Sequence, residues 1–173
     1  MIPQTTVIKT PNGNVNHTTY SYHQMPTGSI GPVSIKYDFT IVLKDSTVLN
    51  ARTRIEYKDS TNIVTVKDKN EKRIIKPSET VELFRILPDG RKFGGIATDS
   101  CWLFQCTKGK INGYSRLADQ NEDHVVAIQT GDGPILPLSK DNLLDMVGEH
   151  KYCIELIEKK KFIKAIETYN KEK

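Results

Sequence analysis

The chain has 173 residues, a length that favours one domain or one domain with an appendage. Hydrophobic residues make up 37% and charged residues 27%, a globular composition that excludes an intrinsically disordered chain. The formal net charge is +4, and the basic residues are interleaved with 21 acidic ones. The longest basic run is Lys159-Lys160-Lys161, directly after Glu158. We expect no concentrated basic face, which makes nucleic acid an unlikely partner.

No segment approaches the roughly 20 consecutive apolar residues of a transmembrane helix, so we expect no membrane span. Residues 1–6 have neither the charged nor the apolar region of a signal peptide, which leaves a cytoplasmic location open. The three cysteines, Cys101, Cys106 and Cys153, are an odd number and do not form a disulfide framework. One pair between Cys153 and either of the others remains open. We expect no bond between Cys101 and Cys106, which would lie about 16 Å apart along a strand.

Residues 1–38 predict an extended, partly irregular segment that leads into the main body. Short strands are expected over residues 5–10 and 18–22, where β-favouring residues gather. The Pro/Gly-rich stretches 11–14 and 26–32 are typical of loops.

Hydrophobic and polar residues alternate clearly from residue 39 onward. Residues 39–44 predict one strand and 49–57 the next, with Leu49, Ala51, Thr53, Ile55 and Tyr57 on one face. Within a later strand, Trp102, Phe104 and Cys106 are expected to lie on the core face, which carries the large aromatics, and to be more buried on average than Leu103 and Gln105. Further strands are expected over 63–67, 72–76, 81–87, 101–107, 110–117, 124–129 and 134–138. Short connections between roughly eight strands favour an antiparallel sheet, a sandwich or a small barrel-like body.

The periodicity changes to that of helices at Ser139, a typical helix cap that precedes residues 140–147 and Gly148. Amphipathic spacing then recurs at Cys153, Leu156 and Ile157 and in the segment 162–169. The prediction is an α+β fold with two or three C-terminal helices. Residues 1–138 form its β-rich body, and the helical segment 139–173 packs on the same domain.

The residues that carry chemistry do not form a recognisable constellation. A thiol nucleophile needs a nearby base, and Cys101 with His124 is the best candidate pair. Cys101 directly precedes the apolar residues Trp102, Leu103 and Phe104, which instead favours a buried structural role for this cysteine. None of the four histidines, His17, His23, His124 and His150, has metal-ligand spacing, and five positions put Cys101 and Cys106 on opposite strand faces.

Two loops superficially match ion-binding or phosphate-binding motifs. Asp119, Asn121 and Asp123 match the first three calcium ligands of an EF-hand loop, but His124 and Thr130 occupy its Gly and Glu positions. Residues 131–133 (Gly-Asp-Gly) read as a turn, since neither phosphate-binding glycine motif is present. We therefore assign no catalytic, cofactor-binding or metal-binding residue, and we expect no cofactor.

Several short segments support a resemblance that covers residues 39–173. They are Ile41-Val42-Leu43-Lys44-Asp45-Ser46, Ile74-Ile75-Lys76-Pro77-Ser78-Glu79, Val81-Glu82-Leu83-Phe84, Gly109-Lys110-Ile111-Asn112-Gly113-Tyr114, Leu136-Pro137-Leu138 and Tyr169-Asn170. With these segments the chain resembles uncharacterised exported or envelope-associated proteins of Bacteroidetes-type bacteria. The resemblance implies a β-rich body followed by helices, and a periplasmic or extracellular location.

The leading functional hypothesis is a non-catalytic protein that binds another protein or a surface glycan in the bacterial cell envelope. One alternative is an enzyme whose site is assembled from scattered residues, with Cys101 and His124 as a thiol-based centre. A second alternative is a binder of polyanions or nucleic acid that uses the basic run 159–161. The sequence leaves the partner and the oligomeric state open.

Overall fold

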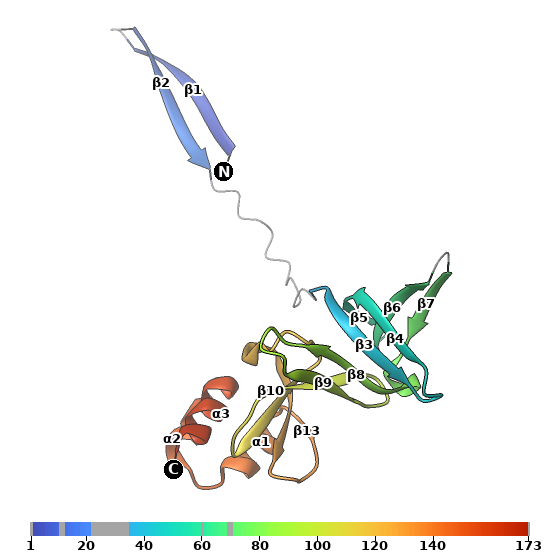
Figure 1. Ribbon diagram of the computed structural model, residues 1–173. Helices are drawn as coiled ribbons and strands as arrows, with labels where there is room; N and C mark the ends of the chain where they lie inside the picture. The colour runs from blue at the N-terminus through green and yellow to red at the C-terminus, as the bar shows by residue number, and fades with distance from the viewer. Residues whose placement is uncertain (1, 11–12, 22–34, 60, 69–70, 173) are drawn as a thin grey trace. The chain divides into compact units, whose positions relative to one another are not determined.

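The computed structural model describes residues 2–10, 13–21, 35–59, 61–68 and 71–172 (Figure 1). The chain divides into two compact units, Met1–Val33 and Ser34–Lys173. The first unit contains an antiparallel hairpin of β1 (Ile2–Thr10) and β2 (Gly13–Ser21). Its nine-residue strands are longer and more regular than the lead-in expected from the sequence. The loop predicted over 26–32 lies outside the described residues.

The second unit confirms the α+β prediction, with antiparallel strands followed by three helices. Its strands are β3 (Tyr37–Leu43), β4 (Val48–Thr53), β5 (Ile55–Lys58), β6 (Thr61–Asp68), β7 (Glu71–Ile75), β8 (Thr80–Ile86), β9 (Lys92–Ala97), β10 (Trp102–Thr107), β11 (Ile111–Ser115), β12 (Val125–Thr130) and β13 (Leu136–Pro137). Two short 3-10 helices, η1 (Pro77–Glu79) and η2 (Glu122–His124), connect strands. The helices are α1 (Lys140–Val147), α2 (Lys151–Glu158) and α3 (Phe162–Lys171).

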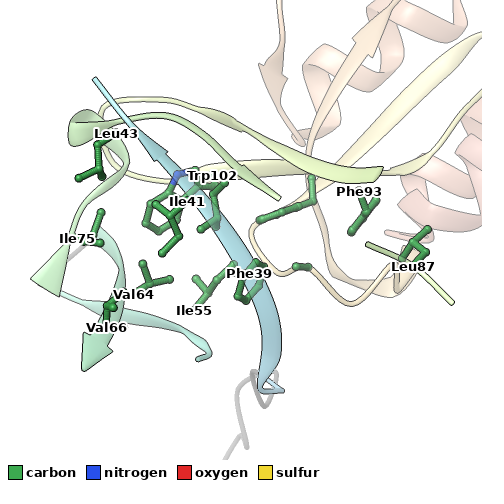
Figure 2. Close-up of a cluster of buried hydrophobic side chains, with 13 residues drawn as sticks. Phe39, Ile41, Leu43, Ile55, Val64, Val66, Ile75, Leu87, Phe93 and Trp102 are labelled. Carbon is green, nitrogen blue, oxygen red and sulfur yellow. The ribbon is translucent and has the colours of Figure 1, made fainter. Parts of the chain in front are cut away.

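The strands form two sheets whose facing sides enclose a hydrophobic core. The eight-stranded sheet has the order β13-β12-β11-β10-β9-β8-β3-β4, is not closed into a barrel, and lies beside the three-stranded sheet β5-β6-β7. Figure 2 shows Phe39 and Ile41 of β3 facing Ile55 and Val64 of the smaller sheet. These four side chains are at most 2% exposed, so this part of the body is a packed sandwich.

The alternating segment 49–57 forms two strands where the sequence predicted one. Arg54 separates β4 from β5, and the chain passes there from the large sheet into the small one. The expected face continues through Thr53 and Ile55, which are buried, and ends before Tyr57, which is 61% exposed. The sequence pattern does not reveal this corner because the alternation continues through it.

Strand β9 was not predicted, because two consecutive glycines, Gly94 and Gly95, interrupt its pattern. Gly95 faces the core, where a Cβ atom would lie 2.8 Å from Cζ of Phe104 and 2.9 Å from Cβ of Trp102. Both aromatic side chains are 0% exposed, so close packing requires a glycine at this position.

Replacing Gly95 by alanine should lower the free energy of unfolding by about 1–3 kcal/mol, the usual cost of overpacking a rigid core. Gly94→Ala is the matched control, since its new Cβ would meet the flexible Glu82 side chain at 3.3 Å. We expect a change within about 0.5 kcal/mol for the control. Urea denaturation followed by circular dichroism measures both, and equal effects of the two changes would contradict the close packing at Gly95.

The orientation expected for β10 is confirmed. Trp102 and Phe104 are both 0% exposed and belong to the sandwich core, whereas Gln105 is exposed. Leu103, on the opposite face, is also buried at 7%, because a separate small cluster covers it. The indole Nε1–H of Trp102 donates to Oγ1 of Thr80 at 3.0 Å, so the one polar atom of this buried ring is paired. Cys106, on the same face, is partly buried against the helical cluster.

The three helices pack on strands β11 and β12, at the end of the body away from β5–β7 (Figure 1). A cluster of Leu143, Val147, Cys153, Leu156, Ile157, Ala165 and Ile166 from the helices shares its interior with Ile111, Val125 and Ile128 from the sheet. Ser139 caps α1 as expected, its Oγ accepting the Asn142 N–H at 3.2 Å. The Asn170 side chain joins α3 to the sheet through two 2.8 Å hydrogen bonds, one with the N–H and one with the C=O of Ile111.

The turn between α2 and α3 holds Lys160 in the left-handed region, with φ of 58°. The N–H groups of Lys160 and Lys161 donate at 2.9 Å to the carbonyls of Ile157 and Leu156. This is a Schellman motif, whose left-handed position is usually occupied by glycine.

We expect Lys160→Gly to raise the free energy of unfolding by about 0.5–1 kcal/mol, because glycine removes the steric cost of positive φ. Lys164→Gly is the matched control with the same charge change at an exposed position in the first turn of α3, and it should cost about 0.5–1 kcal/mol. Thermal melting should show a higher melting temperature than the wild type for Lys160→Gly and a lower one for Lys164→Gly. A destabilised Lys160→Gly protein would refute the motif.

Candidate functional site

The outer face of the eight-stranded sheet, opposite the core, is the most distinctive surface of the second unit. Strand register defines it, because alternate residues of a strand point to opposite faces. Val42 pairs with Val48 of β4 and with Glu82 of β8, and Ile96 of β9 pairs with Leu103 of β10. Leu83 pairs with Gly95, so Glu82 and Ile96 are neighbours and the row is continuous across five strands.

Large aliphatic side chains on this part of the sheet are open to solvent. Val81 is 63% exposed, Ile86 56% and Ile96 50%, all on the adjacent strands β8 and β9. Val81 falls at a register shift that leaves it unpaired with β3, so it does not follow the alternation of Leu83 and lines the groove with Ile96. Val48, at the β4 end of the row, is 56% exposed. Single exposed apolar residues are ordinary, whereas four on one region of a sheet mark a surface that is suited to interaction.

A charged pair lies within this apolar surface. The ammonium of Lys92 contacts both carboxylate oxygens of Glu82, at 2.6 and 2.7 Å, and lies 4.1 Å from the centroid of the Phe84 ring. The cation therefore covers one side of the ring while it is paired with the carboxylate. Both charged side chains are partly exposed, so the pair contributes little to stability.

An open groove of about 520 Å³ runs over β8 and β9. It is lined by Thr80, Val81, Glu82, Gly94, Gly95, Ile96 and Ala97. Gly94, which has no side chain on this face, keeps the floor of the groove low, and the aliphatic side chains and Glu82 form its sides. Such an open depression fits a protruding side chain of another molecule better than a small molecule, which is normally enclosed.

The thiol-based pair suggested by the sequence does not assemble. The Cys101 thiol and N–H contact Thr98, with Sγ 3.4 Å from Oγ1, and Cys101 belongs to a small buried cluster on the outer face. His124 instead bonds Asp119, with Nδ1 2.8 Å from Oδ2. All three cysteines are free thiols, and Cys101 and Cys106 contribute to different clusters.

The remaining cysteines are unsuited to nucleophilic catalysis. Burial raises the pKa of the Cys106 thiol, and the charges of Glu122 and Asp119 raise it further. Burial likewise raises the pKa of Cys153, which is 0% exposed. A thiol nucleophile requires a lowered pKa, so these environments favour the unreactive protonated form.

The segment that resembles a calcium loop is a hydrogen-bonded turn. Oδ1 of Asp119 accepts the Asn121 N–H at 3.1 Å, and Oδ1 of Asn121 accepts the Asp123 N–H at 3.0 Å. Oδ1 of Asn121 thereby caps η2, and the other carboxylate oxygen of Asp119, Oδ2, bonds the His124 ring. Within the described part of the chain, no three His, Cys, Asp or Glu side chains are grouped so as to hold a metal ion.

The basic run 159–161 lies at the α2–α3 turn among acidic side chains. Lys159 is 3.8 Å from Glu155, and Glu158 pairs with Lys140 at 2.8 Å. The three lysines are exposed and are surrounded by side chains of both charges, which is typical of a solvated surface.

The sequence did not point to the groove, because its floor belongs to β9, the strand that was missed. Glu82 and Lys92 are ten positions apart, and only the β8–β9 pairing brings them together. The exposed Val81 and Ile96 resemble ordinary strand residues in the sequence. The one feature of the sequence that could have indicated the site is the Gly94-Gly95 dipeptide, because a glycine inside a strand often marks a position where another group packs closely against the backbone.

The second unit is thus an open antiparallel sheet with a sandwich core, a helical layer and an exposed apolar outer face. The sequence matches no known family model, and neither a curated protein nor a solved structure shows significant similarity to it. Among the described helices, none is long and apolar enough to cross a membrane.

Proposed function

We propose that the protein is a non-catalytic binding protein that docks another protein on the outer face of β8 and β9. The observation that carries the proposal is the exposure of Val81 and Ile96, each at least half exposed, along an open groove, with the exposed Ile86 further along the same strand pair. Burial of such side chains at an interface would remove apolar area from water, the main favourable term in association.

A protein partner fits this face better than a glycan. Sugar recognition commonly stacks a ring on an exposed aromatic face, whereas one side of Phe84 is covered by Lys92. The Glu82–Lys92 pair beside aliphatic side chains has the composition of an interface with an apolar centre and polar surroundings. Binding of a surface glycan is the second outcome that the experiment below distinguishes.

A double variant, Val81→Lys with Ile96→Lys, tests the proposal. Partners are captured from extracts of the native host, purified, and measured by calorimetry with wild-type and variant protein. We expect the variant to bind at least about thirtyfold more weakly, because two central apolar anchors each contribute more than about 1 kcal/mol. Ile74→Lys, at a 50% exposed residue of the other sheet, is the matched control and should bind as the wild type does.

Equal binding by the wild type and the double variant would refute docking on this face. The wild-type protein is also tested on a glycan array. If it binds a glycan and the same two substitutions abolish that binding, the partner is a sugar and not a protein. An envelope location is a further part of the proposal and rests on the sequence resemblance alone. Fractionation of host cells tests it, and recovery in the cytoplasmic fraction would contradict it.

A further inference from the structure

Arg85 of β8 points to the core side of the sheet, opposite the face just described, and is only 9% exposed. Its Nε–H donates to the carbonyl of Ala118 at 2.8 Å. Its guanidinium carbon lies 4.0 Å from the centroid of the Tyr37 ring and 5.3 Å from that of Phe93. The cation is therefore held in place by one hydrogen bond and two aromatic rings.

This buried cation has no acidic partner among the described residues. Arg52, Arg54 and Arg91 lie on the surface, and each is within 3.5 Å of a carboxylate. The carboxylate of Asp119, adjacent in sequence to Ala118, is occupied by His124 and by the Asn121 N–H. Burying a charge is unfavourable unless an opposite charge or sufficient hydrogen bonds compensate for it.

The two terminal amino groups of the guanidinium remain available. Nε of Arg85 is the one nitrogen with a hydrogen-bond acceptor in the described part of the structure. The only sealed, unpaired side-chain polar atom found among the described residues is Oδ1 of Asn62, so Nη1 and Nη2 are still reached by solvent. An anion that approaches this end would find donors that are already oriented and partly desolvated.

The geometry points to Arg85 as the anchor of a carboxylate-binding site between Tyr37 and the Ala118 segment. With Nε occupied by Ala118, the paired Nη1 and Nη2 groups present the planar, two-pronged arrangement that matches a carboxylate. The flanking rings of Tyr37 and Phe93 restrict water and strengthen the charge interaction. A free small carboxylate and the C-terminal carboxylate of a peptide share this chemistry. The site is independent of the proposed docking face.

Thermal melting and NMR titration with sodium acetate, against sodium chloride at equal ionic strength, test the site. Acetate should raise the melting temperature of the wild type saturably, because a ligand that binds only the folded state stabilises it. The backbone amides of Tyr37 and Ala118 should shift with the same dissociation constant. Arg85→Met keeps the length of the side chain without its charge, and should lose the acetate response while melting in chloride at or above the wild-type temperature.

Arg85→Lys retains the charge without the fork and should bind acetate at least about tenfold more weakly, which keeps the test valid if the methionine variant does not fold. Arg116→Met, at an exposed arginine, is the matched control and should respond as the wild type does. A peptide with a free C-terminus that binds more tightly than acetate and than its amidated form identifies a peptide source. Equal affinities of acetate and the free peptide identify a small carboxylate. The site is refuted if acetate acts no differently from chloride on the wild type, if Arg85→Met responds as the wild type does, or if inorganic phosphate binds more tightly than acetate.

Discussion

Replacing Trp102 by alanine is expected to lower the free energy of unfolding by about 3–5 kcal/mol. The indole is 0% exposed in the sandwich core, and truncation would leave a large cavity beside Phe104 and Ile41. It would also remove the donor to Oγ1 of Thr80. Urea denaturation followed by far-ultraviolet circular dichroism is the appropriate measurement, since Trp102 is the one tryptophan of the chain and its fluorescence is lost in the variant.

Two controls separate the contributions to this loss. Trp102→Phe keeps a ring in the core and should cost about 1–3 kcal/mol, from lost volume and the lost hydrogen bond. Gln105→Ala changes an exposed residue of the same strand and should stay within about 0.5 kcal/mol of the wild type. A loss below about 1 kcal/mol for Trp102→Ala would contradict the buried position and make this residue a candidate binding anchor.

Ile157→Ala should lower the free energy of unfolding by about 2–5 kcal/mol, because this α2 side chain is 0% exposed in the cluster that joins the helices to the sheet. Tyr152→Ala on the same helix is the matched control, and its 52% exposure predicts a change within about 0.5 kcal/mol. Chemical denaturation monitored by tryptophan fluorescence also tests coupling, because Trp102 lies in the other core cluster. A variant with unchanged fluorescence midpoint but lost helix signal would show that the helices unfold separately.

Removing residues 139–173 extends the same test. Truncation would uncover Ile111, Val125 and Ile128, which are at most 7% exposed beneath the helices. We expect aggregation or loss of a cooperative transition, as measured by size-exclusion chromatography and thermal melting. A monodisperse fragment with the wild-type melting temperature would instead assign the helices to a detached arm that binds a partner.

The sequence by itself predicted the α+β class, most strands of the body and the C-terminal helices, because these depend on local periodicity. Alternation identified β3 and β4, and helical spacing at Cys153, Leu156 and Ile157 identified the buried face of α2. The core side of β10 also followed from composition, since Trp102 and Phe104 are too large and apolar to face water. Such features are properties of a few neighbouring residues.

Only the tertiary structure decided which residues meet. The sandwich corner at Arg54, strand β9 and the contact of Glu82 with Lys92 all depend on pairing between strands. The local sequence also does not reveal that the guanidinium of Arg85 is buried between aromatic rings, with no acidic partner among the residues that the structure describes. Burial and charge compensation are set by atoms distant in the chain, so one sequence shows which side chains are present but not which of them remain unpaired.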